Sequence, residues 1–80
     1  MATYLVYRVE TIKEKGILHL VGKTRLHPPQ NKASLAVWII SVVGIKKFQP
    51  SRYMIIRHEK GKPQLIFDGY IGQNYIIQYR

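Results

Sequence analysis

The stretch LAVWIISVVGI at residues 35–45 decides the fold, because it is the long apolar run in the middle of the chain and has no clean hydrophobic period. Six of its eleven residues are Val or Ile, and Gly44 interrupts its end. β-Branched residues favour strands, and a run that is apolar throughout favours a strand covered on both faces. We therefore predict that Leu35–Ile45 is a central strand.

A helix is the alternative for this stretch. Ser34 could cap such a helix, and the inward side chains would then be Leu35, Trp38, Ile39 and Val42. Trp38 belongs to the core in either structure. A membrane-spanning helix needs about 20 apolar residues, so the run is too short to cross a bilayer.

Outside this stretch, apolar and polar residues alternate with a period of two, which is typical of half-buried strands. Turn signals at Lys13–Gly16 and Lys60–Pro63 each join two alternating segments into a hairpin, and we expect Gly16 to supply a positive φ. Pro28 and Pro29 mark a loop, since proline cannot donate to a strand ladder. The alternating segments are 4–12, 17–26, 53–59, 64–68 and 74–80.

These segments predict five or six short strands in a single domain, residues 1–80. The predicted fold is all-β, a small antiparallel barrel of the OB or SH3-like kind, because closure removes exposed strand edges. The alternative is an α+β fold in which Leu35–Ile45 is a helix packed on an antiparallel sheet. A domain of this size buries only about 60% of its unfolded surface, so a partner or an oligomer would stabilise it.

The charge of the chain is its strongest functional signal. Lys and Arg number 13 against 4 Asp and Glu, which gives a formal net charge of +9. A field of this sign attracts polyanions, such as nucleic acid, anionic lipid or an acidic protein surface. The alternative interpretation is that the charge only keeps the protein in solution.

The residue types that carry catalysis or bind metals form no useful pattern. The carboxylates are not paired for acid–base chemistry, the histidines lack metal-ligand spacing, and cysteine is absent. We therefore expect no enzyme activity, no metal and no cofactor. The first residues lack the pattern of a signal peptide, so we expect a cytoplasmic location. The residues considered are Glu10, Glu14, Glu59, Asp68, His19, His27 and His58.

Basic residues interleaved with tyrosines favour single-stranded nucleic acid, because cations neutralise phosphates and unstacked bases lie on aromatic rings. The side chains expected to point away from the core form one sheet face and the tip of the second hairpin. No recognition helix is visible, so single strands are preferred over duplex DNA, without base-specific readout. The predicted binding residues are Tyr4, Arg8, Lys23, Arg25, Lys46, Lys47, Tyr53, Arg57, Lys60 and Lys62.

A protein-interaction module is the alternative function, either as a homodimer or as a small subunit of a larger assembly. The last predicted strand is rich in tyrosine and could pair with the edge of a partner. Its candidate interface residues are Tyr75, Ile77 and Tyr79. Attachment to an anionic membrane surface has less support, because no strongly amphipathic helix is visible.

One part of the chain resembles a known family. The stretch FQPSRYMII at 48–56, followed by GKPQLIFD at 61–68, resembles the closing hairpin of the small OB-type single-stranded-DNA-binding proteins of filamentous phages. The shared pattern is a proline turn, a strand with an aromatic residue, a glycine turn and an apolar strand ending in Asp. It covers about a quarter of the chain. The resemblance implies an OB-like barrel.

Overall fold

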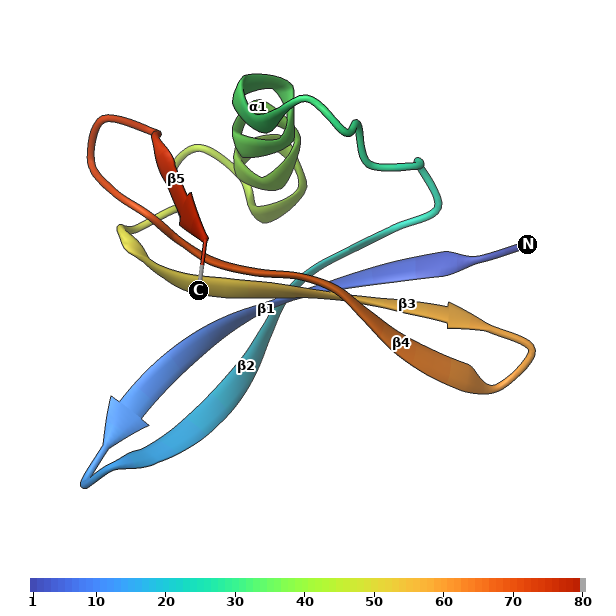
Figure 1. Ribbon diagram of the computed structural model, residues 1–80, viewed down its shortest axis with the longest axis horizontal. Coiled ribbons are helices and arrows are strands. Elements are labelled where there is room, and N and C mark those ends of the chain that lie inside the picture. The colour runs from blue at the N-terminus through green and yellow to red at the C-terminus, as the bar shows by residue number, and fades with distance from the viewer. Residues whose placement is uncertain (80) are drawn as a thin grey trace.

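The computed structural model describes residues 1–79, which form one antiparallel sheet and one helix (Figure 1). The elements are β1 (Thr3–Ile12), β2 (Lys15–Thr24), α1 (Lys32–Val43), β3 (Ser51–Glu59), β4 (Lys62–Ile71) and β5 (Ile77–Tyr79). The strand order is β2-β1-β3-β4-β5, and all neighbouring strands are antiparallel. The predicted small antiparallel β-rich domain is confirmed. The sheet is open, however, so the fold is the α+β alternative rather than a closed OB or SH3-like barrel.

The stretch 35–45 is helical, and the prediction of a strand for it was wrong. Asn31, not Ser34, caps the helix: its Oδ1 accepts a hydrogen bond from the Ser34 N–H at 3.0 Å. At the other end Gly44 has a φ of 99°, a conformation that glycine adopts easily, and its N–H donates to the Ile40 carbonyl. The buried side chains lie on one face of the helix, so packing of that face overrides the β propensity of Val and Ile. They are Leu35, Ala36, Ile39 and Val43.

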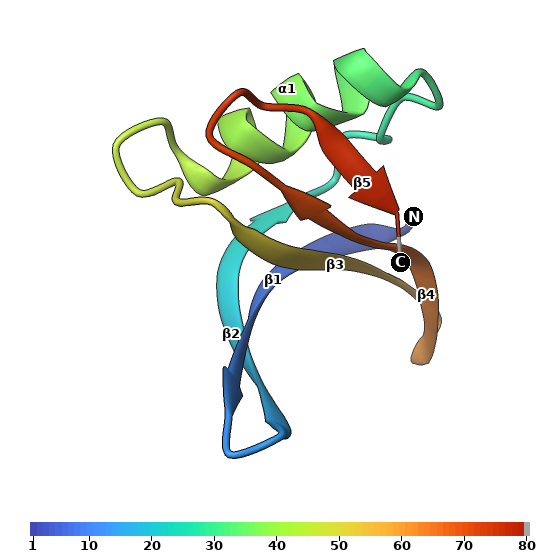
Figure 2. The ribbon, with the colours of Figure 1, turned by 60° about the vertical axis from the view of Figure 1, so that its left-hand side comes forward.

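The core lies between α1 and one face of the sheet (Figure 2). The strands β1, β3, β4 and β5 each contribute side chains to the sheet face that α1 covers. These are Tyr4, Val6, Tyr53, Ile55, Phe67, Ile71 and Ile77. β2 approaches α1 closely at Gly22, where a Cβ atom would lie 2.6 Å from Cγ1 of Val42. Only a residue without a side chain fits this contact between strand and helix.

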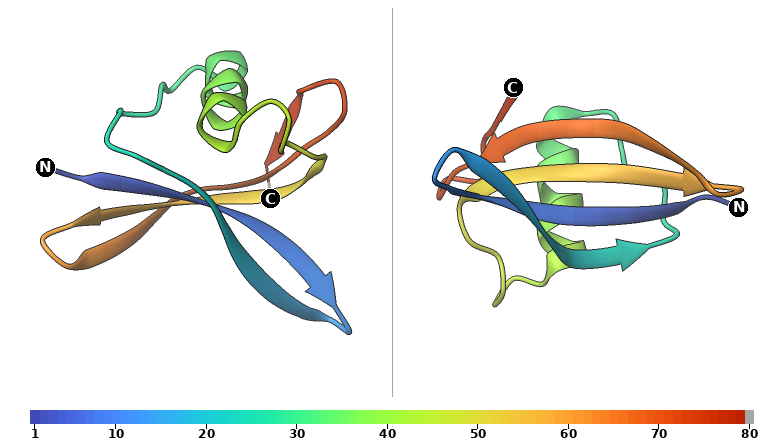
Figure 3. Two further views of the ribbon diagram at one scale, coloured as in Figure 1. Left: turned by 180° about the vertical axis from the view of Figure 1, so that it is seen from behind. Right: turned by 90° about the horizontal axis from the view of Figure 1, so that it is seen from below.

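Both long hairpins bend away from α1, so the sheet face opposite the helix is concave (Figures 2 and 3). Register shifts occur between β1 and β2 at Val6/Tyr7 and between β3 and β4 at Ile55/Ile56. Bulges of this kind bend a strand and increase its twist.

Each hairpin closes with two residues of positive φ, as type I′ turns require. In the second turn these are Lys60 (φ 53°) and Gly61 (φ 75°). In the first they are Lys13 (φ 49°) and Glu14 (φ 67°), so the positive φ expected at Gly16 falls on its predecessors. Within residues 1–79, no helix has the length and apolar character needed to cross a bilayer.

Candidate functional site

A cleft of about 490 Å³ lies on the helix side of the sheet, at the end where β1 begins; we call it the end cleft. The strand register places Tyr4 of β1 beside Arg57 of β3, and Arg57 beside Gln64 of β4, so these residues lie abreast. The loop after β2 and the last residues of β5 close the other sides. The lining residues are Tyr4, His27, Pro28, Pro29, Gln30, Leu35, Ile55, Arg57, Gln64, Ile66, Phe67 and Tyr79.

The proline loop forms a fixed wall of the end cleft. His27 Nδ1 lies 2.9 Å from the carbonyl oxygen of Pro28, and because a carbonyl only accepts, Nδ1 carries the proton. The His27 ring also packs edge-on against Tyr4, with 5.6 Å between the ring centroids. Because the proton of the neutral ring is on Nδ1, Nε2 of His27 is an acceptor. Pro28 itself is buried, which anchors the loop to the core.

Arg57 is the cation at the centre of this end of the sheet. Its guanidinium pairs with the carboxylate of Glu59, two residues further along β3. Hydrogen bonding with the side chain of Tyr4 raises the pKa of Arg57, and the charge of Glu59 acts in the same direction. Arg57 thus carries a permanent positive charge next to the cleft, with a carboxylate already at its side.

Tyr79 lines the end cleft, and Lys32 contacts its ring. Lys32 Nζ lies 5.4 Å from the centroid of the Tyr79 ring, within the range of a cation–π contact. The Tyr79 ring also packs against Phe67 in an edge-to-face arrangement, with 5.6 Å between the ring centroids. The Tyr79 residue is 56% exposed, so its ring combines a fixed position with an accessible surface.

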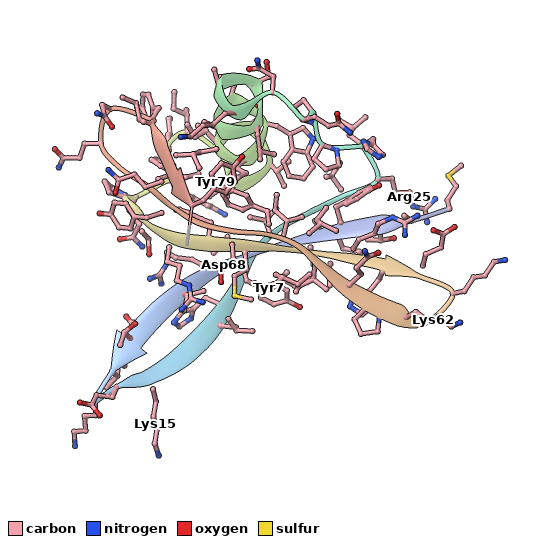
Figure 4. All side chains as sticks on the ribbon, viewed as in Figure 1. Tyr7, Lys15, Arg25, Lys62, Asp68 and Tyr79 are labelled. Carbon is pink, nitrogen blue, oxygen red and sulfur yellow. The ribbon has the colours of Figure 1, made fainter. Side chains whose placement is uncertain are left out.

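A shallower depression adjoins the end cleft and shares Arg57 and Gln64 with it. It lies at the tip of the β3–β4 hairpin and is lined by Lys60 and Lys62. Among the residues that line the end cleft and this depression, Glu59 is the acidic one. Arg25 lies at this same end of the molecule, whereas Lys15 marks the tip of the other hairpin (Figure 4). The cleft, this depression and Arg25 together form what we call the basic end.

The basic end brings together residues from both predicted sets. Tyr4, Arg57, Lys60 and Lys62 were predicted to bind nucleic acid, and Tyr79 was predicted as an interface residue. Arg25, also from the first set, lies nearby (Figure 4). The pairing of β1, β3 and β4 places Tyr4 beside Arg57 and brings the Lys60–Lys62 tip to this end. Tyr79 comes from β5, where it pairs with Gly69, and lies further from the hairpin tip (Figure 4).

Four other predicted cations lie elsewhere. Arg8 pairs with Tyr53 in the register, four residues and about 13 Å along β1 from Tyr4. Lys46 and Lys47 follow the far end of α1, and a helix of 12 residues is about 18 Å long. Lys23 pairs with Leu5, whose side chain projects from the sheet face that α1 leaves uncovered. These four residues do not join the basic end.

The prediction that Tyr4 and Tyr53 point outward as stacking rings was wrong. Tyr4 is 3% exposed and Tyr53 is fully buried, because their side of the sheet faces α1. β1 alternates with the predicted period of two, but the side chains that were predicted to point away from the core, such as Tyr4, are the ones that face α1. Tyr4 contributes only to the wall of the end cleft, and Tyr79 is the exposed ring there.

The predicted interface residues also separate. Ile77 is a core residue, so it cannot face a partner. Tyr75 is exposed but sits in a turn at a φ of 61°, with its ring edge-on to Phe48 at 5.6 Å. Only Tyr79 lies in β5 with an accessible ring.

Sequence reasoning missed His27, which lines the end cleft, and Lys32, which contacts Tyr79 beside it. The signal for Lys32 is Asn31, whose side chain is a favoured helix cap and places the next residue in the first turn of a helix. That signal is useful only when the following stretch is interpreted as a helix. His27 has no comparable signal, because its position depends on the path of the proline loop.

Among the side chains described, no group of three or more metal-binding residues comes together. Comparisons of the chain with family models, with curated proteins and with solved structures gave no match.

Proposed function

We propose that the protein binds single-stranded DNA or RNA in the cytoplasm, through the basic end and without base-specific readout. The observation that carries this proposal is that the end cleft is lined by both an exposed ring and a cation, and adjoins a depression lined by further cations. The ring is that of Tyr79, which contacts Lys32, and the cation is Arg57. Lys60 and Lys62 line the adjoining depression.

Each part of this arrangement suits one part of a nucleotide. The lysines and Arg57 can neutralise phosphates, and a base can stack on Tyr79, which is worth about 1–3 kcal/mol per base. The net charge of +9 supplies long-range attraction to the polyanion. Buried rings such as Tyr4 fix the wall of the cleft rather than contact the bases.

Single strands fit this surface better than duplex DNA. Reading of a duplex needs an element that enters a groove. α1 is packed on the sheet, its last turn holds no basic residue, and its exposed side carries Val37 and Ser41. An unpaired strand can instead follow the rim of the cleft and place one base on Tyr79.

The test is fluorescence polarisation of labelled single-stranded and duplex oligonucleotides across a salt series. We expect single strands to bind more tightly, with an affinity that falls by a slope of about 0.7 per phosphate contacted. Equal, weak binding to both oligonucleotides and to heparin, lost at physiological salt, would show that the charge gives only a nonspecific field.

Matched variants locate the site. Lys62→Ala and Lys15→Ala remove the same charge from the tips of opposite hairpins, and only Lys62→Ala is expected to reduce the salt slope, by about 0.7. Tyr79→Leu and Tyr70→Leu each remove an exposed ring, on opposite faces of the sheet. Tyr79→Leu is expected to weaken binding about fivefold to a hundredfold, and Tyr70→Leu to leave it unchanged.

Protein–protein contact through β5 is the second candidate function. β5 is an edge strand of three residues, and it exposes Tyr79 while Ile77 lies in the core. A homodimer or a larger assembly would use this edge and the neighbouring Tyr75. Sedimentation of the purified protein checks it: a monomer at micromolar concentration whose oligonucleotide binding depends on Tyr79 contradicts this candidate.

A further inference from the structure

The sheet face opposite α1 carries many apolar side chains and is covered by nothing within residues 1–79; we call it the open face. The register and the alternation of side chains place on it Leu5, Tyr7, Leu18, Leu20, Met54, Ile56, Leu65 and Tyr70. Leu18, Leu20 and Leu65 are each half exposed or more. Tyr7 projects away from the helix, as Figure 4 shows. Contiguous apolar surface of this kind marks an interaction site.

The charges on and around the open face are mostly positive. On the face, Arg52 and Asp68 form a two-point ion pair, with 2.8 Å and 2.7 Å between the paired atoms. Lys23 adds a further positive charge beside Leu5. The hairpin tips at the two ends of the concave face carry Lys13 and Lys15 with Glu14 on one side, and Lys60 and Lys62 with Glu59 on the other, so positive charge is in excess at each tip. An occupant of the face therefore meets an apolar centre and basic ends.

The curvature of the sheet restricts the shape of the occupant. Because both hairpins bend away from α1, a rod fits the face better than a flat sheet does (Figure 2). An α-helix is a rod about 10 Å wide, and about 18 residues of helix span 27 Å, comparable with the 33 × 29 × 23 Å extents of the molecule. A second copy would offer another concave face of the same charge sign, which neither fits nor attracts.

We propose that the open face binds an amphipathic helix of a partner protein, with leucine-like side chains on its apolar side and Asp or Glu on its polar side. The apolar side packs on the leucines of β2 and β4 and on Met54. The acidic residues pair with Lys23 and with the hairpin-tip lysines. This site lies on the face of the sheet opposite the end cleft, and the residues that it shares with the basic end are the hairpin-tip lysines Lys60 and Lys62.

The test uses a fluorescein-labelled helical peptide of about 18 residues, with Leu at i, i+3, i+4 and i+7 and Glu on the other side. A scrambled peptide of the same composition is the probe control. We expect the amphipathic peptide to bind at least tenfold more tightly at physiological salt. Equal affinity for both peptides would overturn the proposal, since charge alone would then explain the binding.

Protein variants place the peptide on the open face. Leu20 is 56% exposed and Leu26 is 70% exposed, so Leu20→Ser and Leu26→Ser make the same change on the open face and in the loop after β2. Leu20→Ser is expected to weaken peptide binding about tenfold, and Leu26→Ser less than twofold. Circular dichroism confirms that both variants fold. Equal effects of the two variants would overturn the proposal.

Two further measurements separate this site from other occupants and from the basic end. Tyr79→Leu is expected to leave peptide binding unchanged, whatever it does to oligonucleotide binding. Sedimentation with and without Leu20→Ser detects a second copy: a dimer that Leu20→Ser dissociates would assign the open face to self-association and contradict the helix. Tighter binding of the unmodified protein to anionic vesicles than to the peptide, lost in Leu20→Ser, would contradict it as well.

Discussion

The hydroxyl of Tyr53 donates a hydrogen bond to the carbonyl oxygen of Gln49, with 2.7 Å between the two oxygens, and the Gln49 N–H points back at the same hydroxyl from 3.4 Å. Phe48 stacks on the Tyr53 ring at a centroid distance of 5.6 Å. The buried end of β3 therefore holds the segment that returns from α1 to the sheet. Without this contact, the backbone of Gln49 would lose its partner inside the fold.

Tyr53→Phe is expected to lower the free energy of unfolding by about 1 kcal/mol, because it removes the donor and leaves the Gln49 carbonyl unpaired. In a domain of this size that corresponds to a fall in Tm of about 4–8 °C. The matched control is Tyr70→Phe, which removes a hydroxyl from an exposed ring on the open face. Thermal melts in which the two variants show the same fall in Tm would contradict this account.

The same tyrosine predicts a loss of stability at alkaline pH. Burial raises the pKa of Tyr53, while the hydrogen bond that its oxygen accepts from the Gln49 N–H and the charge of Arg8 lower it by less. The unfolded chain therefore loses this proton first, at a pH of about 10. The stabilisation is complete below pH 10 and is lost as the pH rises through the higher pKa of the folded state. Urea unfolding of the protein and of Tyr53→Phe at pH 8 and pH 10.5 should show a larger loss for the protein that keeps Tyr53.

The hairpins were predictable because their signals are local. Alternating apolar residues and turn residues placed strands at 4–12 and 17–26, and the structure has them at Thr3–Ile12 and Lys15–Thr24. The second hairpin agrees similarly, although β4 runs on to Ile71. The last strand was predicted at 74–80, whereas β5 holds only Ile77–Tyr79.

The middle segment and the orientation of β1 depended on tertiary contacts. The segment 35–45 is rich in β-branched residues, and its helix is stabilised by one face packed on the sheet. In β1 both alternating sets are apolar, with Tyr4 and Val6 on one side and Leu5 and Tyr7 on the other. The period of two therefore identified a strand but not its buried side. The same ambiguity misplaced the stacking tyrosines of the site.

Asn31 at the start of α1 gives a test of the cap. Asn31→Ala removes the acceptor for the Ser34 N–H and is expected to cost about 1 kcal/mol. Asn31→Asp keeps an acceptor and adds a negative charge to a helix whose first turn has no acidic residue. The free energy of unfolding of this variant should therefore equal or exceed that of the unmodified protein. Chemical unfolding followed by circular dichroism measures both variants, and the reverse order of stability would contradict the capping role.

Gly22 gives a test of the close approach between β2 and α1. A Cβ at this position would lie 2.6 Å from Cγ1 and 3.0 Å from the carbonyl oxygen of Val42, so Gly22→Ala is expected to destabilise the fold by about 1–3 kcal/mol. Gly16→Ala is the control in the same strand, because its nearest neighbour would be Val9 at an ordinary 3.6 Å. We expect Gly16→Ala to change stability by less than about 0.5 kcal/mol. Similar melting temperatures for the two variants would show that α1 can move away from the strand.

Glu59 provides a prediction in which binding becomes stronger, and it rests on the proposed binding of nucleic acid. This carboxylate pairs with Arg57 and is the acidic residue among those lining the basic end. Glu59→Gln releases Arg57 and removes repulsion of phosphate, so single-stranded oligonucleotide should bind several-fold more tightly at low salt. Glu14→Gln changes the net charge equally at the tip of the other hairpin and controls for the overall field. If both variants gained the same affinity, the phosphates would be responding to the net charge of the protein and not to a site at Arg57.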